Sequence, residues 1–429
     1  MSSKEGWREC KIRDLFASSI PGDWGDEGSP DNGVPVLRST NFRNDGSIDF
    51  SDLAFRKIDA PRLEKRRVKK GTILVEKSGG SPVQPAGRVV FCDCDFSGTA
   101  SNFIEVIEVE DGHSAKYVSY LLYYLYQIGL ILKYQQQTTG IINFKLGQYI
   151  EEAISLPVDK PEQTKIAEVL STVDRAIEQT EALIAKQQRI KTGLMQDLLT
   201  RGIDEHGNLR SEETHAFKAS PLGRIPVEWD IKPLAKLADI DRGKFTHRPR
   251  NDPRFCGGTF PFIQTGDVTS RVGRRIYLFS QTLNERGMKV SKEFPVDTIA
   301  VTIAANIADT ALLAFPMYFP DSVVGAVVRT PNNVRFVELM IRKWKPLLEQ
   351  LAPQSAQKNI NLDTLRPLPI PTAQPAEQDR IGDLYEQAET GQEQSERLLG
   401  KLRSTKQALM QDLLTGKKRV TPLLAASEV

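Results

Sequence analysis

Two stretches of the chain decide its fold, because they are copies of one another. Residues 162–200 read EQTKIAEVLSTVDRAIEQTEALIAKQQRIKTGLMQDLLT, and residues 377–415 read EQDRIGDLYEQAETGQEQSERLLGKLRSTKQALMQDLLT. The two align without a gap at a constant offset of 215, and they end in the same LMQDLLT. An internal repeat of this kind predicts that each half of the chain contains the same structural unit.

Both copies are predicted to be long helices. Apolar residues recur at three-and-four spacing, and Glu, Gln, Lys and Arg fill the remaining positions. So narrow an apolar stripe is typical of a helix that packs against one partner helix in a coiled coil. Pro161 and Pro375 stand where a helix starts, and Gly202 and Gly416 where it stops. The residues expected to pack against the other helix or a partner are Ile166, Ala176, Ile177, Ile184, Leu194, Leu198, Ile381, Gly391, Leu398, Leu402, Leu409 and Leu413.

Small residues fall at the same four places in both copies. The aligned pairs are Ala167–Gly382, Ala176–Gly391, Ala185–Gly400 and Gly193–Ala408. Glycine inside a helix costs roughly 1 kcal/mol relative to alanine, so its repetition calls for an explanation. Either these are weak helix positions that have drifted, or a large neighbour packs closely there. That neighbour would be the other helix or a partner subunit.

A globular part precedes each predicted helix, and the two globular parts match loosely. The matched segments are WRECKIRDL (7–15) with WDIKPLAKL (229–237), VPVLRSTNF (34–42) with FPFIQTGDV (260–268), and GTILVEK (71–77) with DTIAVTI (297–303). Strand-like runs and one helix-like segment in each, at 116–134 and 334–351, predict mixed α/β (α+β) domains. Tyr117, Tyr120 and Tyr124 are interpreted as core and not as a base-stacking platform.

The order of these parts divides the chain into six segments. They are a first globular domain at 1–157, a helix at 158–200, a polar linker at 201–225, a second globular domain at 226–372, a second helix at 373–415 and a tail at 416–429.

Composition excludes several classes of protein. No run of eighteen apolar residues is present, which excludes a membrane-spanning helix, and the N-terminus has no signal core, so we expect a cytoplasmic protein. Four cysteines are too few for a disulfide framework. Neither the Cys92–Cys94 pair nor the four histidines show metal-ligand spacing, so no metal site is expected.

Catalytic and cofactor-binding motifs are missing as well. No Pro-Pro occurs, which leaves no Asn/Asp-Pro-Pro-Tyr/Phe loop of an adenine methyltransferase. No glycine-rich dinucleotide fingerprint and no GxxxxGK[ST] loop is present, so this chain is expected to bind no cofactor and to be no enzyme. A nuclease with a dispersed acidic site remains an alternative, because perturbed carboxylates cannot be recognised from sequence.

Four segments, taken in this order, resemble the specificity subunits of Type I restriction-modification systems over essentially the whole chain. They are SLPVDKPEQTKIAEVL (155–170), GLMQDLLTRG (193–202), SPLGRIPVEWDIKPLAKL (220–237) and LPIPTAQPAEQDRIGDL (368–384), and ALMQDLLTGK (408–417) repeats the second. Only EGW (5–7) is left of the family's usual G-x-I-P-x-x-W opener in the first half.

The resemblance implies two target-recognition domains held apart by two antiparallel helices, each domain reading half of an asymmetric, bipartite DNA site. It implies two modification subunits that bind S-adenosylmethionine and methylate adenine N6. Restriction subunits that use ATP and Mg²⁺ would join them. The alternative is a stand-alone coiled-coil DNA-binding adaptor or regulator.

Candidate DNA-binding residues are polar or basic side chains at the ends of predicted strands and in basic clusters. Those placed to read base edges are Arg38, Ser39, Asn41, Lys77, Ser78, Thr138, Thr139, Asn143, Gln264, Thr265, Asp267, Asn306, Gln357, Lys358 and Asn361. Those placed to contact phosphates are Arg66, Arg67, Lys69, Arg242, Lys244 and Arg248. The competing interpretation is that such polar residues only complete turns.

Overall fold

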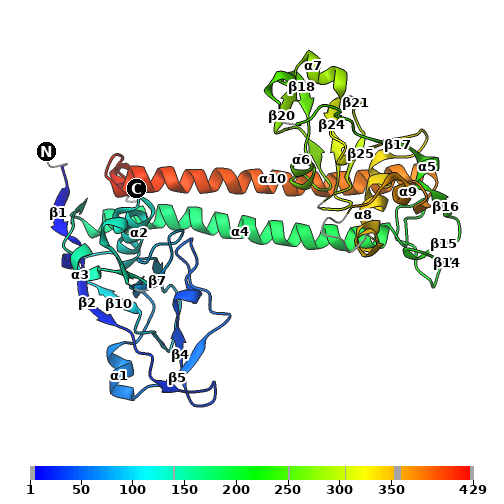
Figure 1. Cartoon of the computed structure of the whole chain (residues 1–429). Helices are drawn as coiled ribbons and strands as arrows, with labels where there is room; N and C mark the ends of the chain where they lie inside the picture. The colour runs from blue at the N-terminus through cyan, green and yellow to red at the C-terminus, as the bar shows by residue number, and fades with distance from the viewer. Residues whose placement is uncertain (1–4, 139–140, 250–251, 305, 352–358, 426–429) are drawn as a thin grey trace. The chain divides into compact units, whose positions relative to one another are not determined.

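The computed structural model describes residues 5–138, 141–249, 252–304, 306–351 and 359–425 (Figure 1). Two compact units emerge: residues 1–181 with 398–429, and residues 182–397. Each unit contains one globular part and portions of both long helices. The predicted mixed α/β class with two globular parts, each followed by a long helix, is confirmed.

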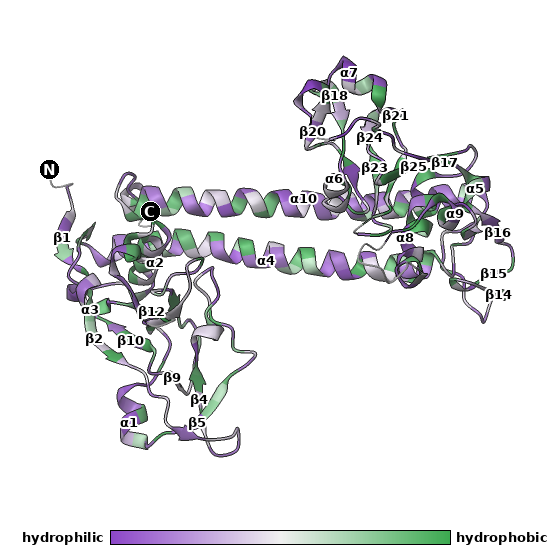
Figure 2. Ribbon diagram, viewed as in Figure 1, coloured by the Kyte–Doolittle hydropathy of each residue, from purple (hydrophilic) through white to green (hydrophobic). Residues whose placement is uncertain are grey.

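The long helices are α4 (Lys160–Leu198) and α10 (Pro375–Leu414). Figure 2 shows hydrophilic residues along most of both helices, with hydrophobic residues recurring between them. Gly202 and Gly416 have φ of +64° and +66°, the left-handed conformation that ends a helix, so the predicted stop signals are confirmed.

Over its described residues, the first unit is built from four small sheets and four short α-helices besides its portions of the long helices. Two sheets have four strands each, in the order β2 (Phe16–Pro21), β10 (Ile104–Val109), β6 (Ile73–Glu76) and β8 (Val89–Phe91), and in the order β3 (Asp26–Glu27), β5 (Ala54–Lys57), β4 (Val34–Leu37) and β9 (Thr99–Ala100). The third sheet has the order β11 (Gln135–Thr138), β12 (Ile141–Phe144) and β7 (Ser78–Gly80), and the fourth pairs β1 (Trp7–Lys11) with β13 (Ala153–Pro157). Its short helices are α1 (Ala60–Lys65), α2 (Ala115–Gln127), α3 (Leu146–Tyr149) and α11 (Thr421–Ala425).

In the part that the structure describes, the second unit also has four sheets, the largest of five strands. The five-stranded sheet has the order β17 (Ala238–Arg242), β25 (Val323–Val328), β22 (Ile299–Thr302), β23 (Thr310–Leu313) and β19 (Arg275–Ile276). The four-stranded sheet has the order β20 (Gln281–Leu283), β18 (Cys256–Phe262), β24 (Met317–Phe319) and β21 (Lys292–Phe294). The two remaining sheets pair β14 (Phe217–Ser220) with β15 (Gly223–Pro226) and β16 (Asp230–Pro233) with β26 (Pro369–Thr372). Its helices are α5 (Leu234–Leu237), α6 (Thr265–Thr269), α7 (Glu285–Val290), α8 (Val334–Leu351) and α9 (Leu362–Leu365).

The internal repeat also appears in the strand pairing. In the first unit β1 pairs antiparallel with β13, the strand that leads into α4. In the second unit β16 pairs in the same way with β26, the strand that leads into α10. Each globular part therefore closes on itself at the start of its long helix.

Hydrophobic cores join each globular part to the helix ends. In the first unit, residues of α2 such as Tyr117 and Leu121 pack in one cluster with Ile166 of α4 and Leu413 of α10. Tyr117 is fully buried, so the interpretation of the tyrosine stripe as core is confirmed. In the second unit the corresponding cluster includes Ile381 of α10.

Two local predictions were wrong. Residues 116–134 are not one helix, because α2 ends at Gln127 and Gly129, with φ of +77°, breaks it before a 3-10 turn at Leu130–Tyr134. The second error is one of omission: the polar linker predicted at 201–225 contains β14 and most of β15 and buries Arg210.

The apolar seam of the helices is thinner than predicted. Among the residues expected there, Ile166, Leu198, Ile381 and Leu413 are buried, whereas Ala176, Ile177, Ile184, Leu194, Gly391, Leu402 and Leu409 are half-buried. Leu398 is 50% exposed and does not belong to the seam. Polar side chains are buried near the helix middles instead: Thr180, Glu389, Gln392 and Ser395. The helices are thus anchored by apolar residues near their ends and by polar contacts between them.

Candidate nucleic-acid interface

The repeated Glu-Gln at the start of each long helix fixes that helix to its globular part. Gln163 accepts a hydrogen bond from the backbone N of Ser114 at 3.0 Å and donates to the Pro157 carbonyl at 2.9 Å. Gln378 does the same with Asn333 at 2.9 Å and Ala373 at 2.8 Å. Ser114 and Asn333 immediately precede α2 and α8. In each unit one glutamine therefore joins the start of the long helix to the strand segment before it and to the start of α2 or α8.

The neighbouring glutamates bind an arginine that follows the other long helix. Glu162 is 1% exposed and takes both ends of the Arg419 guanidinium, at 2.5 and 2.6 Å. Glu377 is 5% exposed and takes Arg210 at 2.6 and 3.1 Å. The indole N–H of Trp229 also donates to Glu377, at 3.2 Å.

Within each unit the paired helix portions run antiparallel. In the first unit Asp174 contacts Lys406 at 2.7 Å, and the later Glu181 contacts the earlier Arg403 at 2.7 Å. In the second unit Lys191 of α4 contacts Glu389 of α10 at 2.8 Å. Lys191–Glu389 and Lys406–Asp174 are the same pair, repeated at the offset of 215.

Two predicted base-reading residues instead build a turn that both halves share. Asn41 accepts a hydrogen bond from the Arg38 backbone N at 2.8 Å, and Asp267 accepts one from the Gln264 backbone N at 2.7 Å. Asn41 is 3% exposed, and its amide also donates to the carbonyls of Asp49 and Asp52. Asn41 and Asp267 are therefore reassigned from base reading to turn formation.

The same turn presents a different side chain in each half. Arg38 extends to the exposed carboxylate of Asp52 at 2.7 Å, and Gln264 donates to Gln281 at 2.9 Å. Ser39 and Thr265 follow them directly and are half-buried. An ion pair with an exposed carboxylate contributes little to stability, so the Arg38 side chain is only weakly held.

A buried ion pair that sequence reasoning missed supports the first turn. Arg88 binds Glu76 through two hydrogen bonds of 2.8 Å, and Glu76 is fully buried. Arg88 also donates to the carbonyls of Ser39 and Phe42, each at 2.9 Å. The available signal was the glutamate at the end of the apolar run TILVE, because a buried charge requires a partner.

Other candidates lie together on the small sheet of β7, β12 and β11. Ser78 donates to Asn143 at 2.6 Å across paired strands, and Lys77 forms an ion pair with Glu105 at 2.8 Å. In the second unit Asn361 caps α9 by accepting from Thr364 N at 2.9 Å, a structural role, and the exposed Asn306 donates to Thr269 at 3.3 Å. Thr139, Gln357 and Lys358, and the side chain of Thr138, lie outside the described residues.

The predicted phosphate contacts lie at the surface with weak intramolecular partners. Arg67 pairs with Glu64 at 3.1 Å, Lys69 pairs with Glu108 at 2.7 Å, and Arg66 donates to the Pro21 carbonyl at 3.2 Å. In the second unit Arg242 and Arg248 both contact Asp321, and Lys244 is exposed. Phosphate contact by these residues stays a prediction.

The described part of the chain has neither a cluster of metal ligands nor a membrane-spanning helix. No group of three or more His, Cys, Asp or Glu side chains among the described residues could hold a metal ion. No described helix is long and apolar enough to cross a membrane.

The duplicated globular parts, the antiparallel helix pairing and the shared turns define a two-domain protein built on an internal repeat. The model of the Type I restriction modification DNA specificity domain matches twice, at residues 4–187 and 226–398, so the chain belongs to this family. As a specificity subunit it is a non-catalytic component of its system.

Relatives and solved structures agree with this family. A protein assigned as the type I restriction enzyme MjaX specificity subunit of Methanocaldococcus jannaschii is 24% identical over 97% of this chain and 94% of its own length. The MjaVIII specificity subunit of the same organism is 34% identical, over only 29% of this chain and 28% of its own. The crystal structure of a Type I S subunit from M. genitalium superposes with a TM-score of 0.63 at 16% identity, covering 95% of this chain and 96% of that one. A chain from a structure of complex assembly and conformational transition of the type I R-M system superposes with a TM-score of 0.56 at 14% identity, covering 97% and 100%.

Proposed function

We propose that this chain reads an asymmetric, bipartite DNA site, one half with each recognition domain, and directs adenine-N6 methyltransferase subunits to it. The observation that carries the proposal is the shared turn with different side chains, Arg38 in one half and Gln264 in the other. Arginine pairs best with guanine and glutamine with adenine in the major groove. A common scaffold with different readers suits a site whose two halves differ.

Exchanging the readers tests this assignment. Arg38→Gln should change the base preference in one half-site only, by about 1–3 kcal/mol of discrimination at one position. Arg43→Gln is the matched control, because Arg43 is exposed on the same loop and pairs with Asp49 at 3.0 Å. If methylated motifs from the two variants and the parent chain are identical, Arg38 is not a reader.

The long helices are proposed to set the spacing between the half-sites. The 39 residues of α4 correspond to about 58 Å at ~1.5 Å per residue, more than one turn of B-DNA at roughly 34–36 Å. Four residues inserted into α4 add ~6 Å, so the unread spacer should change by one or two base pairs while the half-sites stay the same. An unchanged spacer would remove the proposal that the helices act as a ruler.

The modification subunits are proposed to dock on exposed apolar residues of the long helices. Leu183 and Ile190 of α4, seven residues apart, are 46% and 49% exposed, and Leu398 of α10 aligns with Leu183 at the offset of 215. A Cβ at Gly193 or Gly400 would meet no described atom within 4 Å, so the other helix does not explain these glycines. Leu183 and Leu398 thus give each long helix an exposed apolar residue at the same place, which fits two copies of one partner.

Co-purification tests the docking surface. Leu183→Glu should reduce the amount of modification subunit that is retained, whereas Gln179→Glu, which adds the same charge at an exposed position of α4, should not. Full retention in both variants would remove Leu183 from the docking surface, and no retention by the parent chain would favour the stand-alone adaptor. In this proposal S-adenosylmethionine, and ATP with Mg²⁺ for restriction, bind to the partner subunits in the cytoplasm.

A further inference from the structure

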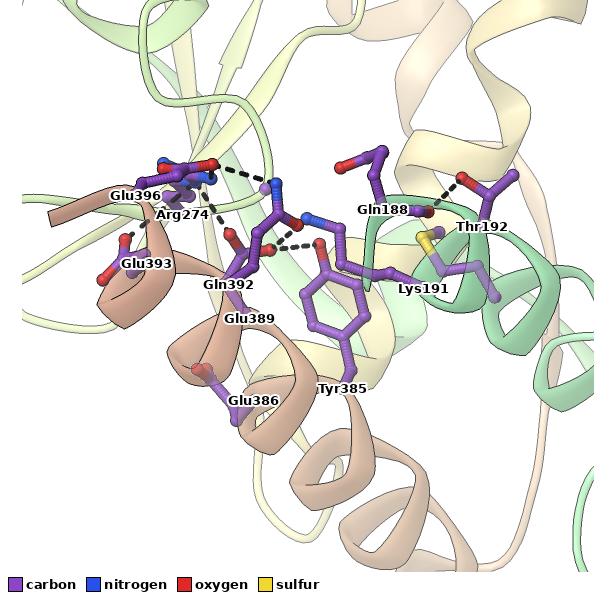
Figure 3. A network of polar contacts seen from close by, with 12 residues as sticks. Gln188, Lys191, Thr192, Arg274, Tyr385, Glu386, Glu389, Gln392, Glu393 and Glu396 are labelled. Atoms are coloured by element: carbon purple, nitrogen blue, oxygen red, sulfur yellow. Dashed lines mark hydrogen bonds and ion pairs between the residues drawn. The ribbon is translucent and has the colours of Figure 1, made fainter. Parts of the chain in front are cut away.

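One arginine of the second recognition domain is bound by three glutamates of α10. Arg274 lies in the loop before β19, and its side chain is 20% exposed. It pairs with Glu389 at 2.7 Å, binds both oxygens of Glu396 at 2.7 and 2.8 Å, and lies 3.9 Å from Glu393 (Figure 3). A bidentate contact of this kind fixes the orientation of the Arg274 guanidinium as well as its distance from Glu396.

The carboxylates that bind Arg274 are themselves held in place. Glu389 is 4% exposed and also contacts Lys191 at 2.8 Å and the Tyr385 hydroxyl at 3.0 Å (Figure 3). Burial alone would raise the pKa of Glu389, but the hydrogen bond from Lys191 and the charges of Lys191 and Arg274 hold that pKa below its ordinary value. Glu389 therefore stays charged, and Arg274 meets a rigid partner.

A second arginine reinforces the same loop. Arg335 of α8 is 4% exposed, donates to the Gly273 carbonyl at 3.0 Å and pairs with Glu386 of α10 at 2.7 Å. The backbone just before Arg274 is thus tied to α8 and, through Arg335, to α10. The cavity bordered by this loop, α4 and α10 measures about 450 Å³.

The first unit has the same acidic positions but lacks the arginine. Asp174, Glu178 and Glu181 align with the three glutamates at the offset of 215. Gly46 and Gly273 both have positive φ, and Gly46 is followed by Ser47, whose hydroxyl donates to Asp45 at 2.6 Å. Where the second unit has Arg335, the first has Lys116, which pairs with Asp93 of its own globular part at 2.8 Å.

The acids of the first unit are satisfied by other means. Glu181 pairs with Arg403 of α10, and Asp174 pairs with Lys406 of the same helix and accepts a hydrogen bond from Tyr120 of α2 at 2.5 Å. Within the described residues of the first unit, no ion pair joins the loop at 43–48 to α4. Arg43 of this loop pairs with Asp49 at 3.0 Å, and Glu181 acts on it only as a more distant charge that raises its pKa. The cavity between that loop, α2, α4 and α10 is correspondingly wider, about 1420 Å³.

We infer that Arg274 is a positioning residue that locks the second recognition domain onto α10 and thereby sets how strictly the spacing between half-sites is read. The inference rests on the proposed function, since spacing matters only for a bipartite site. Arg274 need not touch DNA for this role. The first recognition domain, which lacks this lock, follows the DNA more freely.

The test uses the assembled methyltransferase and a series of DNA duplexes. Each duplex carries both native half-sites, separated by the native spacer or by one base pair more or less. For Arg274→Ala we expect the preference for the native spacer to fall by about tenfold, as is typical for one member of a coupled polar network. Arg274→Lys, which keeps the charge but not the two-pronged contact, should fall between Arg274→Ala and the parent chain.

Matched variants separate the lock from general stability. Arg397→Ala removes an arginine that is 74% exposed and pairs at 3.4 Å with Glu393 of its own helix, so its spacer profile should equal that of the parent chain. If Arg274→Ala fails to assemble, Glu396→Gln weakens the same lock while leaving the Glu389 contact intact.

The outcomes are distinct. A flattened spacer profile with unchanged half-site preferences supports the lock. An unchanged profile for Arg274→Ala, or an equal change for Arg397→Ala, overturns it. A parent complex that methylates no bipartite motif refutes the proposed function, and the lock's role in spacing with it.

Discussion

Removing the arginine from the buried Glu377 cluster should destabilise the second unit strongly. Glu377 lies in the first turn of α10 and has four hydrogen-bond contacts: two from Arg210, one from the Ile203 backbone N at 2.9 Å and one from Trp229. Arg210→Met removes two of these contacts and the compensating charge. A buried ion pair that loses one partner costs about 3–5 kcal/mol.

The repeat supplies an internal comparison. Glu162 has the same role in the first unit, but the side chain of its partner Arg419 is 30% exposed, against 11% for Arg210. Water can take over part of the contact, so Arg419→Met should cost about 1.5–3 kcal/mol, the range for a hydrogen bond to a charged group. We therefore expect Arg210→Met to lower the free energy of unfolding by more than Arg419→Met does.

Urea unfolding of the chain in its complex measures both values. With a slope of about 2 kcal/mol/M, a loss of 4 kcal/mol lowers the transition of the second unit by ~2 M urea. Combining Arg210→Met with Glu377→Gln should recover part of the loss, because the unpaired buried charge is removed. The reasoning is refuted if Arg210→Met costs less than about 1 kcal/mol or no more than Arg419→Met does.

Three further predictions concern the helix ends, the surface and pH. Gly416→Ala should lower the free energy of unfolding by at least ~1 kcal/mol in thermal unfolding, because φ is +66° and a Cβ would lie 2.9 Å from the Trp7 indole. Gly193→Ala should raise the free energy of unfolding by up to ~1 kcal/mol, because a Cβ there would meet open space. Lys244→Ala should weaken binding to specific and non-specific DNA alike and reduce the slope of log K against log salt by ~0.9; an unchanged slope would place Lys244 away from phosphate. Glu389 and Glu396 have pKa values below their ordinary 4.5, owing mainly to Lys191 and Arg274. Their contribution to stability is therefore present above pH 4.5 and is lost as the pH falls through their folded-state pKa values. In urea titrations Arg274→Ala should lose less stability on acidification than the parent chain, and an equal loss in both would contradict this assignment.

The parts of the fold that depend on local pattern were predictable. Both long helices follow from periodicity and their stop glycines, because a helix is specified by residues three and four apart. The segment 334–351 forms α8 as expected. In the first unit the equivalent segment breaks at Gly129, where a single glycine outweighs an otherwise continuous apolar pattern.

The roles of single side chains could not be predicted, because they depend on partners distant in sequence. Asn41 follows a strand end as a base reader would, but two carbonyls eight and eleven residues away take its amide. Arg274 stands between Arg271 and Arg275, and nothing in this local sequence indicates its partners, which lie 115 and 122 residues along the chain. Only the tertiary fold decides between these uses of a polar residue.

The central claim is that this chain chooses the DNA sequence that partner subunits methylate. The most direct test is a map of N6-methyladenine across the host genome, with and without the gene for this chain. We expect one asymmetric, interrupted motif to lose its methylation when the chain is absent and to regain it on complementation. An unchanged map in cells that express both this chain and its modification subunit would contradict the claim.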